Sequence, residues 1–89
     1  MTSIKQQMED ARTVQLLWEA LIPKRQAPAM ERILLWVGTF NEAVIEHGVR
    51  RAAAKFYRDG TMTADDCARY ATSVMRNESA ERKAQCNAV

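Results

Sequence analysis

The chain has 89 residues, a length that suits one domain and is too short for two ordinary ones. Hydrophobic residues make up 47% of it, and 13 basic against 11 acidic residues leave a net charge of +2. This combination argues against strong disorder and against a long acidic or basic tail, and three glycines with two prolines are too few for a turn-rich β-sandwich or barrel.

The first predicted helix covers about residues 3–22. Its apolar residues recur at spacings of three and four, which places them on one helical face: Ala11, Val14, Leu17, Trp18, Leu21 and Ile22. Pro23 ends this helix, because proline cannot continue the backbone hydrogen-bond ladder. Residues 23–28 are then a short connector.

The second predicted helix, over residues 28–47, has the strongest apolar pattern in the chain. Its apolar face covers about half of the circumference once Trp36 is included, which indicates contact with more than one neighbouring helix. Leu35 falls outside this face, among charged residues. Gly48 predicts the end of the helix, as a residue in the left-handed conformation.

A third, short helix is predicted over residues 49–59 and a fourth over residues 63–78. Thr63 and Asp66 are spaced as a capping box at the start of the fourth helix, with aspartate in place of the usual glutamate. The apolar pattern fades after residue 78, so residues 79–89 are expected to be frayed helix or flexible tail. The predicted fold is all-α, a small bundle of four helices, with one domain over residues 1–78.

No arrangement of residues in the sequence predicts catalysis. His47 is the only histidine, and its spacing from Glu42 and Glu46 differs from the Glu-x-x-His element of di-iron bundles. Cys67 lies on the apolar stripe of the fourth helix, and neither it nor Cys86 belongs to a CxxC motif. We therefore expect a protein that is not an enzyme and that holds no metal and no cofactor.

The third predicted helix carries a cluster of positive charge: Arg50, Arg51, Lys55 and Arg58, with no acidic residue between positions 49 and 58. Three of these residues follow i, i+4, i+7 spacing and so share one edge of the helix. Residues 1–48 carry five positive and six negative groups, whereas residues 49–89 carry eight and five. Such an edge can bind phosphates or the acidic side chains of a protein partner, and the same charges also occur on solvated helices without a ligand.

Three apolar residues are candidate anchors for a protein interface: Leu35, Trp36 and Trp18. Tryptophan is enriched among the interface residues that dominate binding energy. The two tryptophans serve as anchors only if they are exposed, and packing in the core is the alternative role for both. Apolar surface that neighbouring helices leave uncovered would mark a homodimer face or a groove for a larger partner.

The sequence thus predicts a non-catalytic, cytoplasmic interaction protein, an adaptor or inhibitor that binds a larger protein or nucleoprotein complex. The alternative is a nucleic-acid-binding accessory protein whose basic helix contacts backbone phosphates. Self-association into a homo-oligomer stays open. No segment approaches the roughly 18 consecutive apolar residues of a membrane span. The polar first ten residues do not resemble a signal peptide, and two cysteines without a motif favour a reducing compartment.

Overall fold

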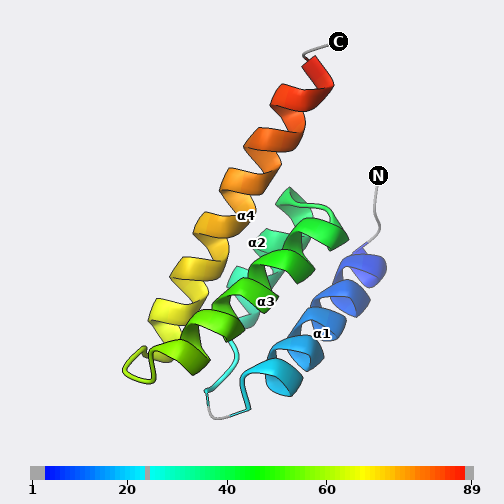
Figure 1. The fold of residues 1–89 in the computed structure, drawn as a ribbon. Coiled ribbons are helices and arrows are strands. Elements are labelled where there is room, and N and C mark those ends of the chain that lie inside the picture. Colours follow the sequence, from blue (N-terminus) through cyan, green and yellow to red (C-terminus); the bar gives the residue numbers. More distant parts are fainter. Residues whose placement is uncertain (1–3, 24, 88–89) are drawn as a thin grey trace.

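The structure is a computed structural model that describes residues 4–23 and 25–87, with side chains as far as residue 83. The described residues form four helices and no strand: α1 (Ile4–Leu21), α2 (Met30–Thr39), α3 (Glu42–Arg58) and α4 (Ala64–Asn87). The predicted all-α bundle of four helices is confirmed (Figure 1). None of the described helices is long and apolar enough to cross a bilayer.

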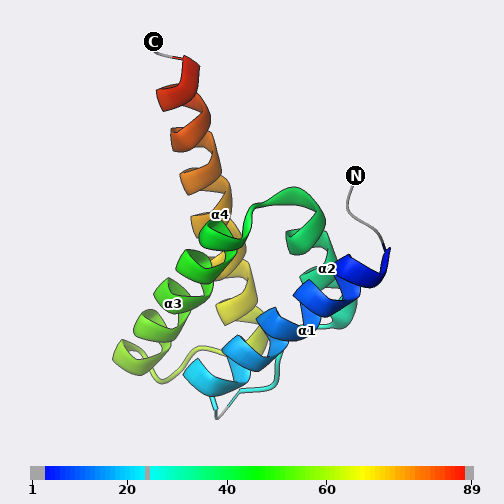
Figure 2. The same ribbon diagram turned by 90° about the vertical axis from the view of Figure 1, so that its right-hand side faces the viewer.

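α3 is the central helix of the bundle. It makes its most extensive contact with α4, and α1 packs against both α2 and α3. The C-terminal end of α4 extends beyond the other three helices, which is plain in two perpendicular views (Figures 1 and 2). One side of α4 is therefore covered by α3, while the side toward α2 is covered only along the short length of that helix.

The break between the second and third helices lies elsewhere than the sequence pattern indicated. We predicted one helix over residues 28–47 and another over residues 49–59, divided at Gly48. In the structure α2 ends at Thr39 and α3 begins at Glu42. The predicted boundary was therefore wrong, although the number of helices was right.

Asn41 sets the start of α3. Its own backbone is extended, and its Oδ1 accepts a hydrogen bond from the Val44 N–H at 2.9 Å. This bond satisfies one of the backbone donors that the first turn of a helix leaves free, and asparagine is among the residues best suited to do so. The apolar spacing did not reveal the break, because α2 and α3 both bury an apolar face on either side of it.

Gly48 lies buried in the middle of α3, not at a helix end. A Cβ atom at this position would come within 2.6 Å of Met75 Cγ and 3.0 Å of the Ala71 carbonyl oxygen, both on α4. None of the described glycines has a positive φ, so the predicted left-handed end is wrong. The missing side chain instead permits the close approach of α3 and α4.

The start of α4 follows the prediction. Thr63 Oγ1 accepts a hydrogen bond from the Asp66 N–H, and Asp66 Oδ2 accepts one from the Thr63 N–H, both at 3.1 Å. These reciprocal bonds form the predicted capping box. Of the frayed helix and the flexible tail expected over residues 79–89, the structure shows helix as far as Asn87. The flexibility of this end stays a prediction.

The centre of the core is a pair of stacked indoles. Trp18 from α1 and Trp36 from α2 are both fully buried, and their ring centroids lie 6.2 Å apart. A side chain without exposed surface cannot reach a partner, so neither tryptophan meets the condition of exposure that an interface anchor requires. Their alternative role, packing in the core, is the one the structure shows.

Candidate binding surfaces

The four basic residues predicted on the third helix, Arg50, Arg51, Lys55 and Arg58, form a surface that we call the α3 edge. Two of them are engaged within the molecule. The Arg50 guanidinium donates hydrogen bonds of 3.0 and 2.9 Å to Glu46 Oε1, one turn earlier in α3. Lys55 Nζ lies 4.7 Å from the centre of the Tyr70 ring on α4, an arrangement in which the ring face attracts the cation.

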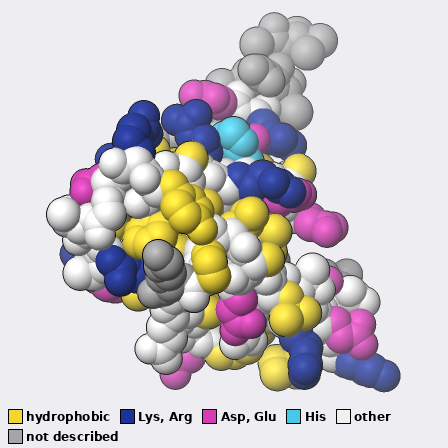
Figure 3. Space-filling view, turned by 60° about the horizontal axis from the view of Figure 1, so that its bottom comes forward, with side chains coloured by type: hydrophobic (Ala, Val, Ile, Leu, Met, Phe, Trp, Pro, Cys, Tyr) yellow, Lys and Arg dark blue, Asp and Glu magenta, His cyan; other side chains and the backbone are white. Residues whose placement is uncertain are grey.

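The other two, Arg51 and Arg58, are exposed and make no hydrogen bond or ion pair with the described residues. Arg51 nevertheless shares a shallow depression with His47, Glu78 and Glu81. The space-filling view shows basic side chains around the histidine with acidic side chains among them (Figure 3). Acidic side chains of α4 therefore interrupt the positive charge around the α3 edge.

Asp59 adds a further negative charge at the end of α3. Its Oδ1 accepts hydrogen bonds from the Thr61 hydroxyl at 2.6 Å and from the Thr61 N–H at 3.2 Å. These two bonds, with a smaller contribution from the positive charge of Lys55, hold the pKa of Asp59 below its ordinary value. The carboxylate stays charged at neutral pH and offsets part of the positive charge nearby.

His47 has one acidic neighbour within ion-pair distance, since its Nε2 lies 3.8 Å from Glu78 Oε2. Within the described part of the chain, no group of three or more His, Cys, Asp or Glu side chains could hold a metal ion. Burial raises the pKa of the Cys67 thiol, which disfavours the reactive thiolate. These residues therefore supply no assembled site for metal or thiol chemistry.

A groove between α2 and α4 was not predicted from the sequence. It is lined by Arg32, Leu35 and Trp36 from α2 and by Arg69, Thr72, Ser73 and Arg76 from α4. We call this surface the α2–α4 groove. A second depression lies further along α4, opposite the end of α2 and the start of α3, and Thr39, Ser79 and Lys83 are among the residues that line it.

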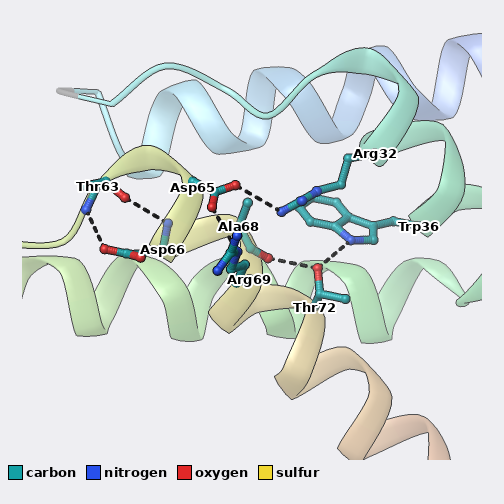
Figure 4. A network of polar contacts seen from close by, with 8 residues as sticks. All are labelled: Arg32, Trp36, Thr63, Asp65, Asp66, Ala68, Arg69 and Thr72. Atoms are coloured by element: carbon teal, nitrogen blue, oxygen red, sulfur yellow. Dashed lines mark hydrogen bonds and ion pairs between the residues drawn. The ribbon is translucent and has the colours of Figure 1, made fainter.

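Two hydrogen bonds hold the floor of the α2–α4 groove (Figure 4). The indole N–H of Trp36 donates to Thr72 Oγ1 at 3.0 Å, and the Thr72 hydroxyl donates to the Ala68 carbonyl oxygen at 2.8 Å. The Thr72 hydroxyl thus donates its proton to the backbone of α4 and accepts the indole N–H through a lone pair of its oxygen. The bond from Trp36 to Thr72 thus links the fully buried indole of α2 to α4.

The walls of the α2–α4 groove combine positive charge with one apolar side chain. Asp65 lies between two guanidinium groups at one end: its Oδ2 is 2.9 Å from Arg69 Nε and its Oδ1 is 3.8 Å from Arg32 Nη1 (Figure 4). Arg76 is exposed and has no ion pair or hydrogen bond with any residue that the structure describes. Leu35 is 59% exposed beside these groups. Three arginines and one aspartate leave an excess of positive charge.

Of the predicted site residues, Leu35 alone belongs to this groove as an exposed side chain, and the residues of the α3 edge lie on another face of the bundle. The groove arginines were missed because Arg32 is far from Arg69 and Arg76 in sequence. One signal was present: Arg69 and Arg76 are seven residues apart, a spacing that places both on one face of a helix.

Comparison of the chain with models of protein families, with curated proteins and with solved structures gave no match. The α3 edge and the α2–α4 groove are the two candidate binding surfaces. Of these, the α2–α4 groove is the one whose positive charge exceeds its negative charge and which also exposes an apolar side chain.

Proposed function

We propose that this chain is a non-catalytic interaction protein, an adaptor or inhibitor, that binds an acidic region of a larger protein through the α2–α4 groove. The observation that carries the proposal is the exposure of Leu35 in a groove lined by arginines of two helices. Protein interfaces combine apolar anchors with arginine in this way, because the apolar contact supplies affinity and the guanidinium groups recognise carboxylates.

The contacts inside the groove favour exchange with a partner. The ion pairs of Asp65 with Arg32 and Arg69 are exposed to solvent, and exposed pairs of this kind typically contribute about 0–1 kcal/mol. A partner carboxylate can therefore replace Asp65 at small cost. The floor beneath stays in place, because the bond between Trp36 and Thr72 does not involve these charges.

A second candidate function uses the α3 edge to contact nucleic-acid backbone. Arg51 and Arg58 favour it, because both are exposed and lack a partner among the described residues. Glu78 and Glu81 lie beside Arg51 and would repel phosphates. The protein partner therefore ranks first.

The proposal includes a cytoplasmic location. Cys67 supports it, because this thiol is buried and free in the structure. A free cysteine is typical of reducing compartments, whereas secreted proteins of this size usually pair their cysteines.

Selection of peptides from a displayed random library tests the proposed function. The full chain is the target, and a Leu35→Ser variant, which alters an exposed side chain, is the target for counter-selection. We expect wild-type-specific peptides that combine Asp or Glu with Leu, Ile or Met. Recovery of the same peptides on both targets would contradict a binding site at the groove.

A binding assay distinguishes the second candidate function from the first. It uses labelled single-stranded and duplex DNA of mixed sequence. Phosphate binding weakens steeply between about 50 and 200 mM salt, because each neutralised phosphate releases counterions. Salt-sensitive binding that is lost in Arg51→Glu and kept in Arg76→Glu would favour nucleic acid at the α3 edge. Light scattering in the same buffers gives the molar mass and shows whether the first partner is a second copy of the chain.

A further inference from the structure

The outer face of α4 carries a regular row of positive charge. Arg69, Arg76 and Lys83 are separated by seven residues each, and all three side chains are exposed. At a rise of about 1.5 Å per residue, successive members lie about 10.5 Å apart and the row is about 21 Å long. A seven-residue repeat drifts by only about 20° per step around a straight helix, so the row stays on one face.

Two members of this row lack the local neutralisation that the other arginines of α4 receive. Arg69 and Arg82 each pair with a carboxylate four residues earlier, namely Asp65 and Glu78. The positions three and four residues on either side of Arg76 are small and uncharged: Thr72, Ser73, Ser79 and Ala80. The last two of these also precede Lys83 by four and three residues. The charges of Arg76 and Lys83 are thus left for a group outside α4.

The row runs past the α2–α4 groove and the depression next to it. Arg69 and Arg76 line the groove itself, and Lys83 lines the depression that follows. Leu35 lines the groove together with Arg76, near the middle of the row. A ligand that satisfies all of these residues must place negative charge about every 10.5 Å and an apolar group beside the central charge.

We infer that the α2–α4 groove binds an α-helix of the partner that carries carboxylates at seven-residue spacing and an apolar residue three or four positions from the middle one. This inference rests on the proposed function and specifies the partner. Glutamates seven residues apart repeat at the same distance as the row on α4. A helix that crosses α4 at about 20° follows the drift of both rows, as in coiled coils whose charged flanking positions pair between helices.

Nucleic-acid backbone fits the same row poorly. Phosphates of one DNA strand follow each other at about 3.4 Å along the helix axis, so most of them would meet no cation on α4. Leu35 would face a polar backbone in place of an apolar side chain. The charge spacing and the apolar side chain both favour a protein helix.

The test compares two synthetic helical peptides of identical composition by fluorescence anisotropy with the full chain. One carries three glutamates at seven-residue spacing with a leucine beside the middle one. In the other, the same glutamates are spread around the helix. We expect the first peptide to bind at least about tenfold more tightly, because only it can meet Arg69, Arg76 and Lys83 together.

Two variants of equal charge locate the binding site. Arg76→Glu and Arg58→Glu both reverse an exposed arginine without a partner among the described residues, one on the row and one on the α3 edge. We expect Arg76→Glu to weaken binding of the first peptide at least about fivefold and Arg58→Glu to change it less than about twofold. Circular dichroism confirms that both variants fold.

Equal affinity for the two peptides would overturn the inference and leave the proposed function standing, because the groove would then attract acidic helices without regard to spacing. Equal losses in the two variants would overturn the placement of the helix on α4. Tighter binding of duplex DNA than of either peptide, lost in Arg76→Glu, would overturn both the inference and the proposed function. Binding of neither peptide would overturn the inference, and the display selection then decides the proposed function separately.

Discussion

α4 meets its two neighbours in different ways. Toward α3 the helices lie so close that a Cβ atom on Gly48 would overlap the side chain of Met75. Toward α2 the polar contacts among the described residues are one indole–hydroxyl hydrogen bond, between Trp36 and Thr72, and one exposed ion pair, between Arg32 and Asp65, with an open groove beside them. One side of the helix is thus packed without space, and the other is bridged by polar groups.

The two sides of α4 are therefore suited to different roles, one to the stability of the fold and the other to binding. Adding atoms to a close-packed contact lowers the free energy of unfolding, because neighbouring groups must shift. Exposed charged groups can exchange partners with little change in the free energy of unfolding. The α3 side of α4 therefore holds the fold, and the α2 side keeps side chains that a partner can engage.

Gly48→Val would test the tight side with the largest expected effect. The new side chain must displace Met75 Cγ or the Ala71 carbonyl oxygen, and the latter belongs to the backbone of α4. We expect the free energy of unfolding to fall by about 1–3 kcal/mol, the usual cost of overpacking. Urea denaturation followed by circular dichroism measures this change.

Gly38→Ala is the matched control, because a Cβ atom at Gly38 would meet no other atom within 4 Å. Alanine favours helix by up to about 1 kcal/mol over glycine, so we expect unchanged or slightly raised stability. Wild-type stability in Gly48→Val would show that α3 and α4 do not depend on their close approach.

Trp36→Phe and Trp18→Phe would test the contact between α2 and α4. We expect their effects on the free energy of unfolding to differ by an intermediate amount. Both variants remove the same atoms from the same buried pair, but only the Trp36 N–H has a hydrogen-bond partner. Trp18→Phe also removes a buried donor without a partner, which is favourable in itself. We expect Trp36→Phe to lower the free energy of unfolding by about 1 kcal/mol more than Trp18→Phe. Equal losses in urea denaturation would contradict a structural role for the bond between α2 and α4.

Much of the fold could be predicted from the sequence, because helices signal themselves locally. The apolar spacing of α1 and the capping box of Thr63 and Asp66 depend on residues within a few positions of each other. Gly48 could not be interpreted in this way. A glycine at a helix end and a glycine at a helix crossing look alike until the residue on the facing helix, here Met75, is known.

The candidate site was less predictable for the same reason. Leu35 stood out because a leucine among charged residues is a local anomaly. The α2–α4 groove depends on how two distant segments meet, and that follows from packing of the core. Arg50 shows the converse case: its charge was evident in the sequence, but Glu46 one turn earlier already neutralises it. A count of charges along the chain does not reveal which of them are free.

Asp65→Asn has the smallest expected effect on stability. It also distinguishes most clearly between the stability of the fold and the affinity of the α2–α4 groove. The carboxylate contacts Arg32 and Arg69 in exposed ion pairs, so we expect the free energy of unfolding to change by less than about 1 kcal/mol. The same change removes the carboxylate that pairs with the groove arginines Arg32 and Arg69. Affinity for the peptide with seven-residue glutamate spacing should therefore rise by about two- to fivefold.

Asp66→Asn is the neighbouring control for this prediction. It changes the net charge equally, but the Asp66 carboxylate accepts a hydrogen bond from the Thr63 N–H at the start of α4 and has no ion pair with any of the three groove arginines. We expect peptide affinity to stay within about twofold of wild type in this variant. An equal gain in both variants would mean that the peptide senses the overall charge of the protein. A gain in Asp65→Asn alone would mean that Asp65 occupies the place of a partner carboxylate. In the free protein Asp65 would then compete with acidic ligands for Arg32 and Arg69, so that weakly acidic surfaces do not bind.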